Sequence, residues 1–313
     1  MALVKAVRQK MKVPVMLMGA SGSGKTVSAL LIAKGIIWEM YPDLTDDERW
    51  EKIAVIDTEH KRSTLYAGMT IEDQEIGNFM LYELNSPYST TRYYDAFQAC
   101  KAAGCDVIIV DSVTHAWSGD GGILSVVDKL GGRFSDWGKV KPDEQKLLSI
   151  FLDQEVHVIA TVRSKQGYEV NKNDSGKLEV EKIGLKADQK DSLEYEFAIT
   201  FQLYQNHTAE AMKDNSNSFD GRFIITEETG KQIYQWAEMG IDIKAEERKK
   251  KKKTIDKIEH LAKLSDKHQE ALEDIQFKMN SIPLEEFPQV ALDKCLILLE
   301  QLDFVEEGSN EKD

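Results

Sequence analysis

The stretch VMLMGASGSGKT, residues 15–26, decides the fold class of this chain. The apolar run at residues 13–18 stops at a glycine, which is typical of a buried strand, and residues 26–40 carry apolar side chains at helical spacing. The turn between them fits the pattern G-x-x-x-x-G-K-[ST]. A strand, this turn and a helix in that order predict a loop whose backbone N–H groups surround phosphate oxygens.

The positions of this loop have expected roles in binding ATP and Mg²⁺, the cofactors that the sequence predicts. The Lys25 ammonium group is expected to reach the β- and γ-phosphates and to act in catalysis, and the Thr26 hydroxyl is expected to bind Mg²⁺. The residues expected to bind the nucleotide are Gly19, Ala20, Ser21, Gly22, Ser23, Gly24, Lys25 and Thr26.

Further buried strands are predicted at residues 53–60, 106–112 and 156–162, with helices near residues 91–103 and 142–152. Helices that alternate with unbroken apolar strands predict an α/β fold with a mainly parallel central sheet flanked by helices. The glycine-rich residues 119–138 are predicted to form a long loop or a partly ordered segment. The sequence also predicts a protruding hairpin at residues 166–190, strands at 194–203 and 221–226, and a closing helix at 228–236.

The composition changes near residue 241 and predicts three regions. Residues 1–240 form the ATPase core, residues 241–306 form a basic linker and a helical hairpin, and residues 307–313 form an acidic, disordered tail. The run RKKKKK at residues 248–253 has two interpretations, a solvated linker or helix end and a phosphate-binding arm.

The overall composition, 42% hydrophobic and 30% charged over 313 residues, is that of a globular protein. The net charge of −14 repels nucleic acid, so any DNA contact requires a local basic patch. The three cysteines lack metal-ligand spacing, the N-terminus lacks the apolar stretch of a signal peptide, and no apolar run approaches the ~20 residues of a membrane span. These features predict a soluble, cytoplasmic protein without membrane contact.

Two carboxylates are candidates for the chemistry of hydrolysis. Asp111 ends the apolar strand VIIVD and is expected to organise Mg²⁺ as a Walker B carboxylate. The next residue is Ser112, so the arrangement with a Glu directly after the Walker B Asp, usual in AAA+ and ABC proteins, is not supported. Glu59, at the end of the strand that follows the phosphate-loop helix, is the candidate that remains for the catalytic base; the alternative is a solvated carboxylate at a strand end.

The segments VIDTEH (residues 55–60) and CDVIIVDSVTH (residues 105–115) resemble the strands that carry the catalytic Glu and the Walker B Asp in RecA-like recombinases. Residues 10–240 resemble more closely the phage-encoded RecA-like ATPases, and this resemblance also includes FSDWGKV, IATVRSK, LKADQKDSLEYEF and ITEETGKQIYQW. The resemblance implies a RecA-like core encoded by a phage or prophage, a head-to-tail oligomer, and action on single-stranded DNA in annealing, with a single-strand binding protein as a further partner. It also implies that Glu59 is the hydrolytic base.

Other groups are expected near the γ-phosphate. Sensor candidates lie at the end of the fourth strand, and the alternative for each is a strand-end group facing solvent; they are Thr161, Arg163 and Lys165. RecA-like ATPases commonly complete the site with a cation from the adjacent subunit. Candidates for that cation, each with an ordinary surface lysine as the alternative, are Lys186, Lys190 and Lys213.

Two segments are candidates for binding single-stranded DNA, because they combine cations with aromatic side chains or with a protruding hairpin. For Phe134 and Trp137, burial in the core is the alternative. The candidate residues are Arg133, Phe134, Trp137, Lys139, Lys172 and Lys177. Competing functions are an ATP-dependent switch or helicase-loading module and a nucleotide kinase, although no clustered arginines follow the phosphate loop to form a kinase lid.

Overall fold

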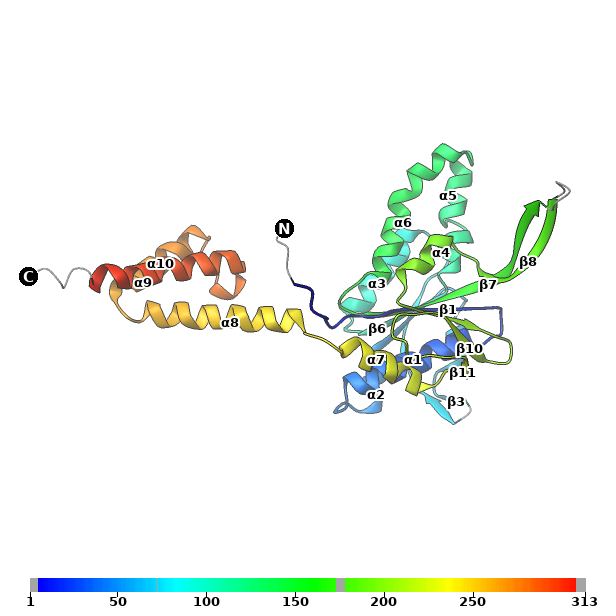
Figure 1. Cartoon of the computed structure of the whole chain (residues 1–313), viewed down its shortest axis with the longest axis horizontal. Coiled ribbons are helices and arrows are strands. Elements are labelled where there is room, and N and C mark those ends of the chain that lie inside the picture. Colours follow the sequence, from blue (N-terminus) through cyan, green and yellow to red (C-terminus); the bar gives the residue numbers. More distant parts are fainter. Residues whose placement is uncertain (1–4, 72, 173–177, 308–313) are drawn as a thin grey trace, which may run out of the picture. The chain divides into compact units, whose positions relative to one another are not determined.

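The computed structural model describes residues 5–71, 73–172 and 178–307, and it divides into two compact units (Figure 1). The larger unit is Met11–Met239. The smaller unit combines residues 240–307 with residues 5–10. The two units are described separately below.

In the described part of the chain, nine strands of the larger unit form one sheet in the order β11-β10-β9-β1-β7-β6-β2-β5, with β8 paired to β7. The strands are β1 (Pro14–Gly19), β2 (Ile53–Asp57), β5 (Met80–Glu83), β6 (Val107–Asp111), β7 (His157–Lys172), β8 (Leu178–Ala187), β9 (Ile199–Leu203), β10 (Thr208–Asp214) and β11 (Arg222–Ile224). The strands from β9 to β5 are parallel, and β8, β10 and β11 pair antiparallel to their neighbours. The predicted α/β fold with a mainly parallel central sheet is confirmed.

Helices cover both faces of this sheet because its central strands are apolar on both sides. On β1, Val15 and Leu17 face one core and Met16 and Met18 face the other. The helices of the first core are α1 (Lys25–Met40) and α7 (Glu227–Glu238), and those of the second are α3 (Thr90–Ala102), α4 (Thr114–Ser118), α5 (Ile123–Leu130) and α6 (Trp137–Phe151). The smaller elements are α2 (Asp46–Trp50), η1 (Arg62–Tyr66), η2 (Phe134–Asp136), η3 (Asp191–Glu196) and the two-stranded sheet of β3 (Met69–Ile71) and β4 (Gln74–Ile76).

Helices α1 and α7 cross at two glycines. A Cβ atom at Gly35 would collide with the backbone carbonyl of Glu227, and a Cβ atom at Gly230 would collide with the backbone carbonyl of Ile32. Glycine at both positions lets the two backbones meet directly. This contact fixes the position of α1, the helix that begins at Lys25.

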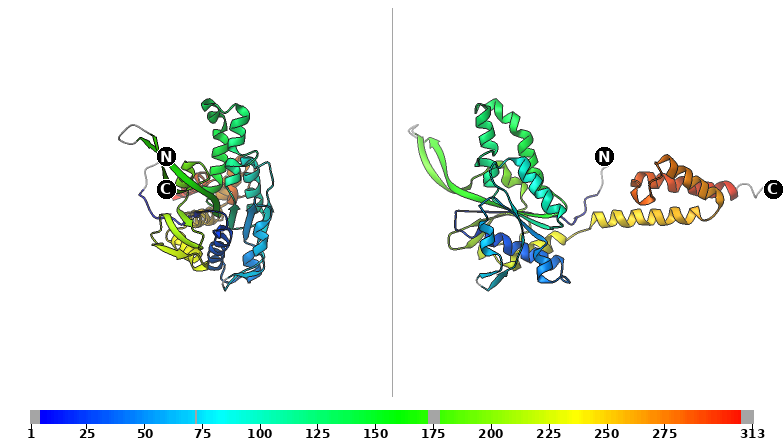
Figure 2. Two further views of the ribbon diagram at one scale, coloured as in Figure 1. Left: turned by 90° about the vertical axis from the view of Figure 1, so that its right-hand side faces the viewer. Right: turned by 180° about the vertical axis from the view of Figure 1, so that it is seen from behind.

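The predicted loop at residues 119–138 is wrong, because most of this segment is helical. Its glycines lie at helix ends: Gly122 precedes α5, and Gly131, with a φ of 115°, ends it. Asp136 then accepts a hydrogen bond from the Arg133 N–H, and α6 begins at the next residue, earlier than predicted. Helices α5 and α6 lie side by side and project from the sheet (Figures 1 and 2).

The later strands also differ in part from the prediction. Strands β7 and β8 form the expected hairpin, and its predicted turn, residues 173–176, lies outside the described residues. Of the predicted strand at residues 194–203, only β9 is extended, and residues 191–196 form the 3-10 helix η3, which buries Leu193. Strand β10 was not predicted.

The described residues of the smaller unit form three helices and a short 3-10 turn, where the sequence predicted a linker and a helical hairpin. They are α8 (Ile243–Ala262), α9 (Asp266–Lys278), η4 (Leu284–Glu286) and α10 (Gln289–Glu307). The basic residues 248–253 are helical, not a linker. Ile258, Phe287 and Leu299 lie at the centre of a separate small core. No described helix has the length and apolar character that crossing a membrane requires, and the predicted tail lies mostly outside the described residues.

Candidate functional site

The phosphate loop connects β1 to α1 as the sequence predicts. Gly24 is the residue before α1 and has a φ of 89°, a conformation that glycine adopts without strain. The Lys25 ammonium group donates hydrogen bonds to the carbonyls of Gly19 and Ala20, each at 2.9 Å. Burial lowers the pKa of Lys25, while the charges of Asp111 and Glu59 oppose this shift. The cation therefore lies inside the loop, close to two carboxylates.

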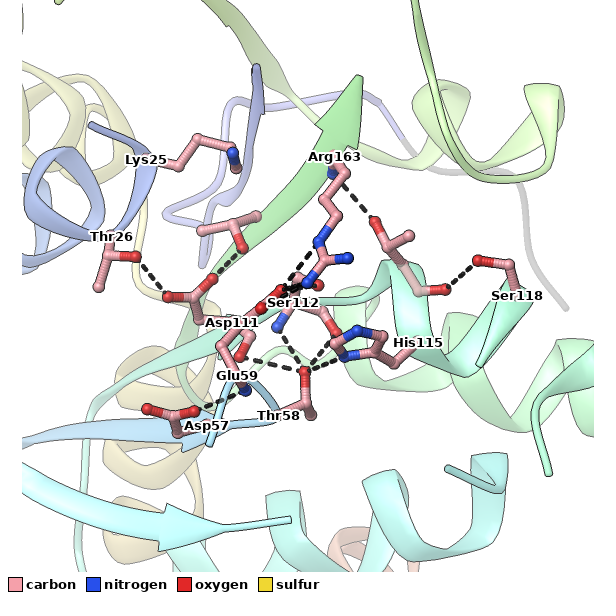
Figure 3. A network of polar contacts seen from close by, with 12 residues as sticks. Lys25, Thr26, Asp57, Thr58, Glu59, Asp111, Ser112, His115, Ser118 and Arg163 are labelled. Atoms are coloured by element: carbon pink, nitrogen blue, oxygen red, sulfur yellow. Dashed lines mark hydrogen bonds and ion pairs between the residues drawn. The ribbon is translucent and has the colours of Figure 1, made fainter. Parts of the chain in front are cut away.

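Asp111 is held by two hydroxyl groups from neighbouring elements (Figure 3). Thr26 Oγ1 donates to Asp111 Oδ2 at 2.6 Å, and Thr161 Oγ1 donates to Asp111 Oδ1 at 2.5 Å. Strand β7 lies between β1 and β6, which brings Thr161 to this carboxylate. Burial raises the pKa of Asp111, and the two hydroxyl donors partly offset this shift.

The donor set of this loop fits Mg²⁺ and a phosphate group. Thr26 Oγ1 and Asp111 Oδ2 are hard oxygen ligands that already lie in contact, and Mg²⁺ prefers one or two such protein ligands together with water and phosphate oxygens. The hydroxyl of Ser23 is buried and has no hydrogen-bond partner among the described residues. A buried hydroxyl without a partner is a donor that a phosphate oxygen can accept from.

Glu59 follows β2 and is oriented by Asp57. The Glu59 N–H donates to Asp57 Oδ1 at 2.7 Å, and the other oxygen of Asp57 accepts from the N–H and the hydroxyl of Ser63. Asp57 is buried and fully occupied by this turn, so it holds the backbone that presents Glu59. The hydroxyl of Ser112, the residue after Asp111, lies 3.4 Å from Glu59 Oε1.

Arg163, at the point where β7 leaves the sheet, forms an ion pair with Glu59. Its Nε donates to Glu59 Oε1 at 3.0 Å, and its Nη2 donates to both oxygens of the same carboxylate. Burial of Glu59 opposes ionisation, but the hydrogen bonds and charge of Arg163 outweigh it and lower the pKa of Glu59. Glu59 is therefore a charged carboxylate at neutral pH.

A second network beneath Glu59 was missed by the sequence analysis. Thr58 Oγ1 accepts from the Ser112 N–H at 2.9 Å and lies 2.7 Å from His115 Nδ1 (Figure 3). The His115 ring stacks on Tyr88, with ring centroids 4.8 Å apart. Burial lowers the pKa of His115. These contacts join the end of β2 to α4. The histidine is part of the segment VDSVTH, but its spacing alone gives no sign of this contact.

The turn between β9 and β10 was also missed, and it lies against the phosphate loop. Gln205 Nε2 donates to the Ser21 carbonyl at 3.0 Å. A Cβ atom at Gly24 would lie 3.1 Å from His207 Nδ1. These two side chains hold the outer side of the loop, and only the order of the strands brings them there.

Two of the three sensor candidates lie in the site, and the third forms an ion pair elsewhere. Thr161 and Arg163 join the site, whereas Lys165 pairs with Asp188 at 2.7 Å. Of the candidates for the neighbouring subunit's cation, Lys190 pairs with Glu144 and Lys213 donates to the Tyr195 carbonyl. The side chain of Lys186 lies outside the described part of the structure.

Phe134, a DNA-binding candidate, has 95% of its surface accessible at the end of the α5–α6 projection. Arg133 lies beside it at the start of η2. Trp137 is partly buried and packs on Trp117, with ring centroids 5.9 Å apart, and Lys139 pairs with Asp136. The side chains of Lys172 and Lys177 lie outside the described residues.

The chain is similar to a solved protein in structure and to a known protein family in sequence. Among solved structures, the chain is similar to the flagellar accessory protein FlaH from Methanocaldococcus jannaschii, with 12% identity and a TM-score of 0.35 over 68% of this chain and 84% of that chain. A likeness at this level carries no argument about function. No curated protein matches the chain. The family model described as "AAA domain" matches residues 11–260. The chain therefore belongs to this AAA-domain family of P-loop ATPases.

Proposed function

We propose that this protein hydrolyses ATP in a Mg²⁺-dependent reaction and acts on single-stranded DNA. The observation that carries the ATPase part is the meeting of three groups at the carboxyl ends of neighbouring strands. These groups are Lys25 in the phosphate loop, the hydrogen-bonded pair of Thr26 and Asp111, and the charged carboxylate of Glu59. Ligands of parallel sheets bind at this edge.

The chain's own residues supply most of the proposed mechanism. Lys25 and the backbone N–H groups of the loop bind and orient the triphosphate. Glu59, charged at neutral pH, accepts the proton of a water molecule that attacks the γ-phosphorus in line with the leaving ADP. Thr26 and Asp111 would hold Mg²⁺, which neutralises phosphate charge when bound.

A Glu59→Gln substitution tests this assignment. We expect normal ATP binding and a turnover reduced by about 10²- to 10⁴-fold, because the amide has no basic oxygen to accept the proton. Glu83→Gln is the matched control, since Glu83 ends the neighbouring parallel strand β5 and pairs with Lys61. Unchanged turnover in Glu59→Gln would remove Glu59 from its role.

A second candidate function, an ATP-dependent switch, is favoured by the ion pair between Arg163 and Glu59. A carboxylate held by a guanidinium is a weaker proton acceptor than a free one, because the cation stabilises its charged form. In this case ATP binding, rather than turnover, would be the functional event. Tight ATP binding with no turnover in the wild-type protein, under every DNA condition, would support the switch.

The DNA part of the proposal is supported by the positions of two projections. The α5–α6 projection carries exposed Phe134 and follows α4, which contacts Thr58 through His115. The β7–β8 hairpin continues the strand that carries Thr161 and Arg163. Both projections are therefore continuous with elements of the nucleotide site, so a change at that site could order or release them.

The corresponding test is the ATPase rate with and without single-stranded DNA, at about 50 and 200 mM salt. We expect stimulation that weakens at the higher salt concentration. Phe134→Ala should reduce it, because stacking on an exposed ring contributes to binding. Phe277→Ala is the control, since Phe277 is 76% exposed on α9 of the smaller unit. Stimulation that survives in Phe134→Ala would exclude this ring as a contact.

The proposed assembly is a head-to-tail oligomer that forms on DNA. The protein would be encoded by a phage or prophage, in line with the resemblance of its sequence to phage-encoded RecA-like ATPases. A cation from a neighbouring subunit would complete the site. Mixing Glu59→Gln chains with chains that carry Lys186→Ala, Lys190→Ala or Lys213→Ala tests each candidate. Recovery of turnover in one mixture would identify the lysine that acts between subunits.

A further inference from the structure

The basic run Arg248–Lys253 has no part in the function proposed above, and the structure shows how it is presented. It lies inside α8, whose first turn is capped by the Asp242 side chain, which accepts from the Ala245 N–H at 2.8 Å. Directly after the run, Thr254 and Ile255 are buried in the smaller unit. The six cations are therefore fixed on a helix, not carried on a loose linker.

These cations face solvent and repel one another. Five of the six are exposed, and Lys251 is half-buried. Lys249 pairs with Glu246 at 3.2 Å, while no ion pair between described side chains involves the other five. Like charges three and four residues apart destabilise a helix. The run therefore weakens α8 unless an anion from outside binds it.

A groove between α8 and α10 is lined by three of these six cations. It has a volume of about 600 Å³ and is lined by Glu247, Arg248, Lys250, Lys251 and Gln289. At its edge, Gln289 Nε2 donates to Thr254 Oγ1 at 3.2 Å and joins the two helices. Gln289 begins α10, and the N-terminus of a helix adds partial positive charge. One carboxylate, Glu247, opposes three cations in this lining.

The chemistry of the lining favours one kind of partner. Among the described residues, the lining has no apolar or aromatic side chain that could anchor an acidic protein segment. None of these described lining residues offers a ring on which a base could stack. Six cations on about 9 Å of helix match a chain of closely spaced phosphates, which requires charge alone.

We propose that residues 248–253 and the groove beside them form a sequence-blind binding surface for the phosphate backbone of nucleic acid, outside the ATPase core. The surface works without ATP and does not rest on the α5–α6 projection or on Glu59. In a chain of net charge −14, it would supply the local attraction that the remainder of the molecule lacks.

The experiment measures the affinity of the full chain for a labelled single strand of about 30 nucleotides, without ATP, between about 50 and 300 mM salt. The test variant combines Arg248→Gln, Lys250→Gln and Lys251→Gln. The control combines Lys263→Gln, Lys278→Gln and Lys294→Gln, which are exposed on the same unit and change the net charge equally. A third protein, Lys25→Ala, disables the phosphate loop.

We expect the test variant to lower the slope of log affinity against log salt by about 2, since each lost cation contributes about 0.7 on single strands. Its affinity near 100 mM salt should fall at least tenfold, while the control and Lys25→Ala stay within about threefold of wild type. Equal losses in test and control variants would mean that net charge alone matters, and would overturn the proposal. An unchanged slope in the test variant would also overturn it.

Two further measurements separate the alternatives. Oligonucleotides of purines and of pyrimidines should bind with equal affinity. A polyglutamate peptide should bind more weakly than DNA. Tighter binding of the peptide would indicate an acidic protein as the partner and would overturn the proposal. The helix content of the test variant should stay the same, with an equal or higher melting temperature, because charge repulsion in α8 is relieved. A loss of helix would show that the run serves the fold instead. Failure of the ATPase tests above leaves these outcomes unaffected.

Discussion

The two edges of the central sheet use polar side chains in opposite ways. At the carboxyl ends of the strands, charged groups meet one another, as Arg163 meets Glu59. At the amino ends, two neutral side chains form hydrogen bonds to neighbouring elements of the fold. His157 Nδ1 accepts from the Val13 N–H at 3.2 Å, and the Tyr41 hydroxyl donates to Asp106 at 2.8 Å.

Function and stability depend on opposite ends of the strands in this molecule. Contacts at the carboxyl edge join ionised groups that a triphosphate and a cation could compete for. At the amino edge, His157 is fully buried, so a ligand does not reach it. Substitutions at the carboxyl edge should therefore change turnover, and those at the amino edge should change the free energy of unfolding.

The greatest change in turnover is expected from a substitution at the carboxyl end of β6, and little change from one next to its amino end. Asp111→Asn should reduce ATP turnover about 10³-fold, because the amide lacks the charge that holds Mg²⁺. It should not lower the free energy of unfolding, since burial already opposes the charged form and raises the pKa of Asp111. Asp106→Asn, at the amino end, is the matched control for turnover measured with saturating ATP. Equal losses of turnover in both variants would contradict the assignment of turnover to the carboxyl ends of the strands.

The next effect concerns the pH dependence of stability at the amino edge. Burial lowers the pKa of His157 to about 3, whereas an unfolded histidine titrates near 6.5. Between these values the unfolded chain binds a proton that the folded chain does not, so stability falls as the pH drops below about 6.5. At pH 5 the loss from this residue should be about 2 kcal/mol relative to pH 7.

Urea unfolding of His157→Asn at both pH values measures this contribution. The Asn side-chain oxygen can accept the Val13 N–H in place of Nδ1, so the variant should lose less stability between pH 7 and pH 5 than the wild type. His260→Asn, an exposed histidine on α8, should leave the wild-type dependence in place. Identical pH dependence in His157→Asn and wild type would contradict the prediction.

A smaller effect is expected in the pH profile of turnover at the carboxyl edge. Arg163 lowers the pKa of Glu59, so the base stays charged as the pH falls. In Arg163→Gln this pKa should rise, and kcat/KM should be lost at a higher pH on the acid side, several-fold below wild type near pH 5. Lys165→Gln, on the same strand and paired with Asp188, is the control. An acid limb that does not move would show that the ion pair is not kept during turnover.

The smallest effect is expected at Tyr41. Tyr41→Phe removes the hydrogen bond to Asp106 and should cost about 1 kcal/mol of unfolding free energy, with turnover unchanged. Burial and the contact with Asp106 raise the pKa of Tyr41 to about 12, so the hydroxyl remains a donor up to alkaline pH. Tyr195→Phe, whose side chain is 79% exposed, should have no effect. Denaturant midpoints measure the stability of both variants. A turnover defect in Tyr41→Phe would contradict the assignment of the amino ends to stability alone.

The central strands could be predicted from sequence because uninterrupted aliphatic runs are buried on both faces wherever they occur. The phosphate loop could be predicted because its residues are contiguous. The glycines at residues 119–138 misled the prediction, since they end helices instead of forming a loop. Helix α8 was missed over its first half, because a helix that is polar on all sides has no apolar period.

The contacts within the site depended on strand order, which sequence patterns leave open. Glu59 and Arg163 were both candidates, but their pairing requires β6 to lie between β2 and β7. The same holds for His115 beneath Thr58, and for Gln205 against the phosphate loop. Each of these contacts joins residues more than fifty positions apart in the chain.

The crossing of α1 and α7 at Gly35 and Gly230 limits which mutations this chain can accept. An added methyl group at either position meets backbone, not a side chain that could turn aside. The two helices would have to separate, and α1 would carry Lys25 and Thr26 with it. In a mutational scan, these two glycines should therefore be as intolerant as the phosphate loop, although Gly35 lies about 15 Å along the helix from Lys25.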